Sequence, residues 1–109
     1  MKLLNTLLVT GFVSLGLVGS SFAAVDEAAA QALAKGSKCL TCHSVDKEKK
    51  GPSFKKVAAG LKGKADAEAT LTKQITTGPK FKDGSGDHPI LDSKDANATK
   101  NLVGWILSR

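Results

Sequence analysis

The stretch Cys39-Leu40-Thr41-Cys42-His43 decides how the rest of this sequence is interpreted. Its two cysteines lie three residues apart, and a histidine follows the second one directly. C-x-x-C-H is the attachment signature of c-type haem. On a helical turn, the two thiols can reach the two vinyl groups along one edge of a haem, and His43 then lies beneath the iron. The motif therefore predicts one covalent haem that is attached through Cys39 and Cys42 and ligated by His43.

Three other kinds of site also use paired cysteines. A thioredoxin-like redox pair normally lies in a βαβ unit, and this sequence shows no sustained period-two pattern of strands. A zinc site needs a fourth ligand, and the only histidine besides His43 is His88, at a spacing that is unusual for zinc. A disulfide between Cys39 and Cys42 would close a very small loop and stabilise the fold little. Haem attachment is the strongest of the four interpretations.

Residues 1–23 are typical of a secretory signal peptide. They begin with Met1-Lys2, continue through an almost wholly apolar segment, and end in Ser21-Phe22-Ala23, which has the small residues of a cleavage site. The apolar segment is shorter than the ~20 residues that a membrane span requires, which argues against an uncleaved anchor. We expect cleavage after Ala23, export to the periplasm, and one mature domain over residues 24–109 that does not span a membrane.

The mature domain has few large apolar side chains, so a large flat cofactor would supply apolar surface that its core lacks. Helical patterns cover residues 26–35, 53–59, 66–77 and 94–108, with Ser53 and Ser93 as the expected N-caps. The glycines and prolines predict loops elsewhere: one around Gly60 and Gly63, and an irregular one over residues 80–92. These features predict an all-α domain with three main helices and long loops that wrap around the haem.

In the order of its motifs the sequence resembles the small single-haem class I cytochromes c of bacteria. The resemblance covers nearly all of residues 24–109. The C-x-x-C-H motif follows a helix, Gly51-Pro52-Ser53-Phe54 is similar to a loop of the family, and residues 102–107 are similar to its C-terminal helix. The resemblance implies the class I cytochrome c fold. It also implies that the Pro52 carbonyl accepts a hydrogen bond from His43 and that Trp105 belongs to the haem site.

The sequence departs from that family at the sixth position of the iron, which most members fill with the methionine of a late Met-Pro pair. The only methionine here is Met1, which leaves with the signal peptide. His88-Pro89 lies where the family has Met-Pro, so we expect His88 to bind the iron. The ordinary alternative is a solvated loop histidine. Weaker candidates for the position are Lys80, Lys82, Lys94 and Asn97, and an open position is the remaining option.

A haem between two histidines favours an electron-transfer protein that is not an enzyme. Its redox potential should be lowered, because imidazole is a better donor to ferric iron than a thioether is. One alternative is a protein that binds or senses CO, NO or O2 through a labile His88. Another is a small subunit of a larger haem enzyme. The sequence alone leaves both open.

The chain is basic, with 16 lysine and arginine residues against 10 acidic ones. Seven of the lysines follow the haem motif closely: Lys47, Lys49, Lys50, Lys55, Lys56, Lys62 and Lys64. They form either a solvated surface or a docking ring near the haem edge for redox partner proteins with acidic surfaces. Export argues against nucleic acid as a partner, and aromatic residues do not alternate regularly with the lysines as a base-stacking surface would require. We expect a monomer.

Overall fold

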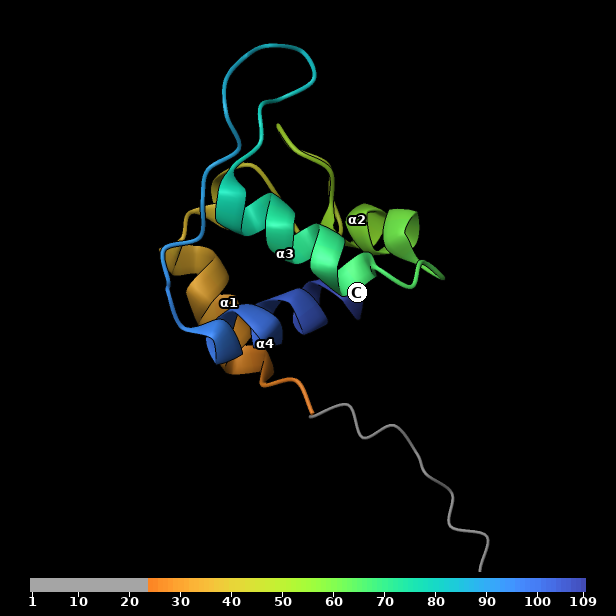
Figure 1. The fold of residues 1–109 in the computed structure, drawn as a ribbon, viewed down its shortest axis with the longest axis vertical. Helices are drawn as coiled ribbons and strands as arrows, with labels where there is room; N and C mark the ends of the chain where they lie inside the picture. Colours follow the sequence, from red (N-terminus) through yellow and green to blue (C-terminus); the bar gives the residue numbers. More distant parts are fainter. Residues whose placement is uncertain (1–23) are drawn as a thin grey trace, which may run out of the picture.

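The computed structural model describes residues 24–109, so the expected signal peptide, residues 1–23, lies outside the described residues. The described part contains four α-helices and one 3-10 turn (Figure 1). They are α1 (Glu27–Gly36), η1 (Cys39–Thr41), α2 (Phe54–Leu61), α3 (Ala67–Thr77) and α4 (Ala96–Leu107). The all-α prediction is confirmed: α1, α3 and α4 are the three main helices, and α2 is shorter. Across residues 24–109, no helix has the length and apolar character to cross a bilayer.

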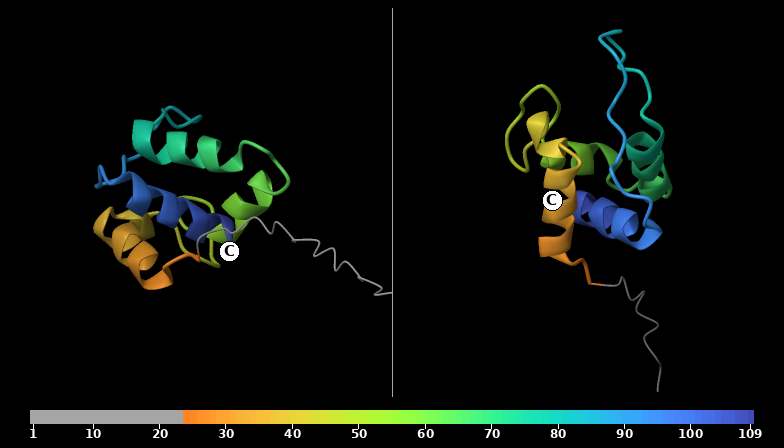
Figure 2. Two further views of the ribbon diagram at one scale, coloured as in Figure 1. Left: turned by 60° about the horizontal axis from the view of Figure 1, so that its bottom comes forward. Right: turned by 90° about the vertical axis from the view of Figure 1, so that its left-hand side faces the viewer.

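Helix α4 is the central element of the fold. It lies between α1 and α3, and it also contacts α2 (Figure 2). Apolar side chains recur on it at the spacing of a helix face, so one stripe of α4 is buried against all three neighbours. The buried residues of this stripe are Leu102, Val103, Trp105 and Ile106. On α1 the facing residues are the small Ala30 and Ala34, which let the two helices approach closely.

Asn101 joins α4 to the start of α1. Its side-chain oxygen accepts a hydrogen bond from the Asp26 amide (2.8 Å), and its side-chain nitrogen donates to the Asp26 carbonyl (2.8 Å). The side-chain amide therefore pairs with both backbone groups of Asp26. Because the Asp26 carboxylate also caps α1 by accepting from the Ala29 amide, Asn101 fixes the first turn of α1 on α4.

Two details of the expected helices are wrong. Asp95, and not Ser93, caps α4: its carboxylate accepts from the amides of Asn97 (2.9 Å) and Ala98 (3.2 Å), and a negative charge is favoured at a helix N-terminus. The Ser93 hydroxyl oxygen accepts from the Asp95 amide in the turn before the helix. Gly60 is helical, because α2 continues to Leu61, whose side chain packs against the core.

The loop after α3 is more regular than predicted. Lys80 and Asp87 form an isolated antiparallel bridge, and the Phe81 amide donates to the Gly86 carbonyl at 2.8 Å. We call residues 78–90 the distal hairpin, which rises away from the helices at the top of Figure 1. Its far end returns to the body of the protein, where the Leu91 amide donates to the Ile75 carbonyl of α3 (2.8 Å).

Replacement of Asn101 by alanine should lower the free energy of unfolding by about 2 kcal/mol, because it removes two hydrogen bonds worth about 1 kcal/mol each. Denaturant titration followed by far-ultraviolet circular dichroism measures this change. Asn97→Ala, at the exposed start of the same helix, is the matched control and should have a smaller effect. Equal losses in the two variants would contradict the role of Asn101.

Candidate functional site

A left-handed residue sets the direction of the Cys39–His43 segment. Lys38, two residues after the end of α1, has a φ of 61°, and the backbone changes direction there. The next residues form η1, in which the amides of Cys42 (3.2 Å) and His43 (2.9 Å) both donate to the Cys39 carbonyl. The two cysteines and His43 therefore lie on one tight turn, as a C-x-x-C-H haem site requires.

Cys39 and Cys42 are half-buried and are not joined by a disulfide. Burial raises the pKa of the Cys39 thiol. Within residues 24–109, no three histidine, cysteine or acidic side chains come close enough together to hold a metal ion.

His43 is oriented by a proline carbonyl and an aromatic ring. Its Nδ1 atom lies 2.7 Å from the Pro52 carbonyl oxygen. Because a carbonyl oxygen only accepts, Nδ1 carries the proton and donates, which leaves the lone pair of Nε2 free to bind a metal. The imidazole also stacks on Phe54, with ring centroids 5.3 Å apart and planes inclined by 23°.

Gly51 provides the space that the His43 ring fills. A Cβ atom at this position would lie 2.7 Å from Cε1 of His43 and 3.0 Å from its Nδ1. The Gly51 amide donates to the Cys42 carbonyl at 2.8 Å, so the backbone here cannot easily move away. Any larger residue at position 51 must therefore displace the imidazole.

His88 lies opposite His43 and is oriented in the same way. Its Nδ1 donates to the Pro89 carbonyl oxygen at 2.7 Å, which again leaves Nε2 free. Its ring meets Phe81 edge to face at 6.0 Å. The centroids of the two imidazole rings are 6.1 Å apart. Bonds of about 2 Å from one metal ion to a nitrogen of each ring would separate the centroids by about 6 Å, so this pair fits a metal between them.

Trp105 contacts His43 indirectly, through the ring of Phe54. It is almost wholly buried and meets the ring of Phe54 edge to face, with centroids 5.5 Å apart. Its Nε1 lies 3.5 Å from a carboxylate oxygen of Glu27, and the guanidinium of Arg109 lies over its ring. Trp105 thus holds Phe54 against His43, and its predicted contact with the cofactor stays a prediction. The weaker candidate ligands are all exposed: Lys80, Lys82, Lys94 and Asn97.

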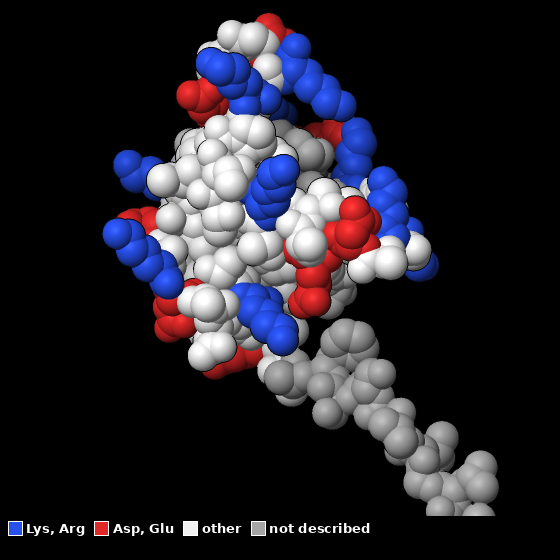
Figure 3. Space-filling model, viewed as in Figure 1, with Lys and Arg blue, Asp and Glu red and all other residues white. Residues whose placement is uncertain are grey.

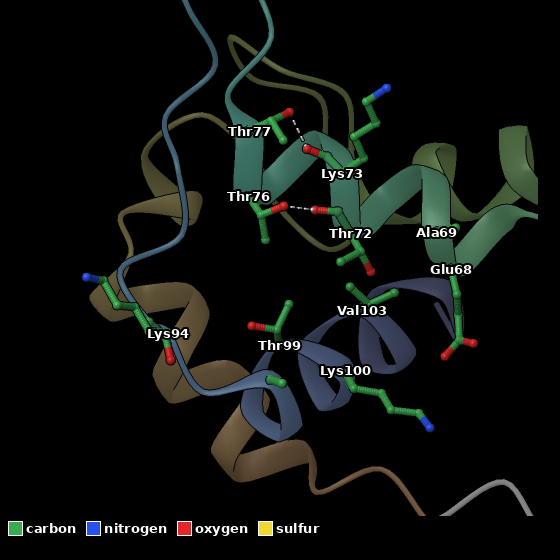
Figure 4. Close-up of a pocket in the computed structure, with 12 residues that line it drawn as sticks. Glu68, Ala69, Thr72, Lys73, Thr76, Thr77, Lys94, Thr99, Lys100 and Val103 are labelled. Carbon is green, nitrogen blue, oxygen red and sulfur yellow. Dashed lines mark hydrogen bonds between the residues drawn. The ribbon is translucent and has the colours of Figure 1, made fainter.

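An open groove between α3 and α4 is not part of this site (Figure 4). Thr76 and Thr77 lie along it and donate their hydroxyls to carbonyl oxygens one turn earlier, those of Thr72 (2.7 Å) and Lys73 (2.6 Å). None of the described residues that line the groove is a cysteine or a histidine.

A comparison with known proteins gives the family of this chain. The family model described as "Cytochrome c" matches residues 27–108. The chain belongs to the cytochrome c family. Cytochrome c-552 of Hydrogenobacter thermophilus is 37% identical over 93 residues, which are 85% of this chain and 88% of that protein. Cytochrome c-551 of Pseudomonas aeruginosa is 35% identical over 79 residues, covering 72% of this chain and 75% of that protein.

Solved structures agree with this assignment. The class 1 cytochrome MtoD from Sideroxydans lithotrophicus ES-1 superposes with a TM-score of 0.70 at 50% identity, over 78% of this chain and 97% of that one. The predicted class I cytochrome c fold is therefore confirmed. As a cytochrome c, the protein carries a single haem c, covalently attached through Cys39 and Cys42.

Gly51→Ala should disturb the site far more than Gly60→Ala, because a Cβ at position 60 meets nothing within 4 Å. We expect Gly51→Ala to lower the free energy of unfolding of the haem-loaded protein by roughly 1–3 kcal/mol, as overpacking typically does. It should also shift the visible spectrum. Gly60→Ala should leave the spectrum unchanged and stabilise α2, since alanine is the better helix former. An unchanged spectrum in Gly51→Ala would contradict the close packing against His43.

Proposed function

We propose that this cytochrome c is an exported, monomeric one-electron carrier whose haem iron is bound by His43 on one side and His88 on the other. The arrangement of the two imidazoles carries the proposal. Their centroids are 6.1 Å apart, and each Nδ1 donates to a proline carbonyl. Both free Nε2 atoms are then available to one iron.

The residues of the chain set the redox behaviour in this proposal. A c-type haem supplies the one-electron couple. The Pro52 carbonyl accepts from His43, and the Pro89 carbonyl accepts from His88, which makes both imidazoles stronger donors. Two strong nitrogen donors stabilise the ferric state more than one nitrogen donor and one thioether do. The redox potential should therefore lie below that of methionine-ligated relatives.

The apolar surroundings of His43 support electron transfer without catalysis of a further reaction. Phe54 stacks on the ring and is itself buried, and Leu71, Ile75 and Leu91 belong to the same core cluster. Apolar packing against one face of His43 holds the ring in place, and the contribution of a protein to its haem is binding, orientation and electrostatics. In this proposal the protein therefore supplies orientation and ligands, and no acid or base.

Export remains part of the proposal, on the sequence of residues 1–23. A c-type haem protein of this kind would act in the bacterial periplasm, after cleavage of the signal peptide following Ala23. N-terminal sequencing of the mature protein from its host would test the cleavage site.

The net positive charge is concentrated on one segment, residues 44–64. This segment has seven lysines and two acidic residues, whereas the rest of residues 24–109 has eight basic and eight acidic side chains. In Figure 3, basic side chains gather along the right-hand edge, over α2 and its flanking turns. Lys55 and Lys56 are paired with Asp46 and Glu48.

Several of the basic side chains in and near this segment line a cleft beside α2. Lys62 and Lys64 line it together with Lys55 and Arg109, and its floor includes Ala58 and Leu107. We place the docking of an acidic partner protein here, since a basic rim around an apolar floor complements an acidic protein surface. Lys55, at one end of the cleft lining, directly follows Phe54, which stacks on His43.

Replacement of His88 is the direct test of the distal ligand. His88→Met restores a Met-Pro pair and should raise the redox potential by on the order of 100 mV, because a thioether stabilises the ferrous state. His88→Ala should leave the position open, with a high-spin spectrum and rapid binding of carbon monoxide to the reduced protein. Redox titration and optical spectroscopy measure both effects. An unchanged spectrum in His88→Ala would remove the proposed ligation.

Charge reversal tests the docking surface. The double variant Lys62→Glu/Lys64→Glu should lose most of the adsorption of the protein to a carboxylate-terminated monolayer on a gold electrode at low ionic strength, measured by voltammetry. Lys73→Glu/Lys100→Glu, on α3 and α4, changes the net charge equally and is the matched control. Equal losses in both double variants would mean that net charge alone, and no localised surface, governs docking.

A further inference from the structure

Both backbone polar groups of His88 lie against the two residues that follow α3. The His88 amide donates to the Pro79 carbonyl at 2.9 Å. The His88 carbonyl oxygen lies so close to Gly78 that a Cβ atom built there would be only 2.5 Å from it. The same Cβ would lie 2.8 Å from Cγ2 of Ile90. The base of the distal hairpin is therefore closely packed on both sides of His88.

We propose that Gly78 is a positioning residue for the distal ligand: it sets the place of the His88 backbone, and through it the distance between the two imidazole rings. This inference rests on the proposed ligation by His88. It assigns to Gly78 a role beyond that of ending α3, where a glycine in the left-handed region is common.

The position of the His88 carbonyl affects the position of the His88 ring, because few bonds separate the two. The ring is held by Nδ1, which donates to the carbonyl of Pro89, the next residue. The amide of His88 is held by Pro79. A Cβ on residue 78 would push the His88 carbonyl away, and the peptide that joins His88 to Pro89 would have to move with it. The Nε2 atom would then leave its place opposite His43.

The tip of the hairpin offers a matched comparison. Gly84 has a φ of +75°, close to the +58° of Gly78, but a Cβ at position 84 meets nothing within 4 Å. Alanine at either position bears a similar strain of the left-handed backbone. Only at position 78 does it also meet the His88 carbonyl. The pair of variants therefore separates backbone strain from displacement of the ligand.

A second variant at position 78 tests the contact with His88 with less strain of the left-handed backbone. Asparagine tolerates the left-handed region better than alanine does, so Gly78→Asn retains the helix end while it still introduces a Cβ. If contact with His88 matters, Gly78→Asn and Gly78→Ala must behave alike. If only the helix end matters, Gly78→Asn must behave like the unmodified protein.

The experiment compares carbon monoxide binding to the reduced, haem-loaded forms of the unmodified protein, Gly78→Ala, Gly78→Asn, Gly84→Ala and His88→Ala. Carbon monoxide binds only to molecules in which the sixth position is free, so its apparent affinity reports that fraction. We expect both Gly78 variants to bind about tenfold more tightly than the unmodified protein. Gly84→Ala should bind as the unmodified protein does. Denaturation midpoints, followed by circular dichroism, record any general loss of stability in parallel.

Each result has a distinct meaning. Unchanged carbon monoxide binding in both Gly78 variants, beside strong binding in His88→Ala, would overturn the role of Gly78 and leave the proposed ligation standing. Equal shifts in Gly78→Ala and Gly84→Ala, with none in Gly78→Asn, would also overturn it, because backbone strain would then be the cause. If His88→Ala itself bound carbon monoxide as the unmodified protein does, the proposed function would fail instead.

Discussion

Two imidazole rings, those of His43 and His88, lie with their centroids 6.1 Å apart, and most of the distinctive features of the fold serve to hold them there. On one side, the left-handed turn at Lys38 leads α1 into the haem motif, and Gly51 leaves room for the His43 ring beside Pro52. On the other side, the loop after α3 folds back on itself and brings His88 to face it. The two rings come from segments 45 residues apart in the chain, so their spacing depends on how the helices between them pack.

The packing that maintains this spacing centres on α4. Its buried stripe contacts α1, which leads into the haem motif, and α3, which leads into the distal hairpin. Trp105 on that stripe meets Phe54, and Phe54 stacks on His43, so a continuous aromatic contact joins the centre of the core to His43. Asn101 fixes the start of α1 on the same helix. The ligand that is expected on the proximal side is thus connected directly to the core, whereas His88 depends on the base of one hairpin.

Local patterns in the sequence were sufficient for the helices and for the haem motif. The C-x-x-C-H spacing and the amphipathic stripe of α4 depend on neighbours within one or two turns, and such signals are visible without the fold. The cap of α4 was assigned wrongly because Ser93 and Asp95 are both favourable N-cap residues, and only the geometry of the first turn decides between them. The roles of Asn101 and Gly78 were not predictable, because each depends on a contact with a residue distant in the sequence or on a backbone angle set by such a contact.

The central claim, that both histidines bind one iron, is tested most directly by pulsed electron paramagnetic resonance of the oxidised protein labelled with 15N-histidine. The chain contains two histidines, so every labelled nitrogen belongs to His43 or His88. The account predicts strong couplings from two axial 15N nuclei in the mature haem-loaded protein, and from one in His88→Met. A single coupled 15N nucleus in the unmodified protein would contradict it.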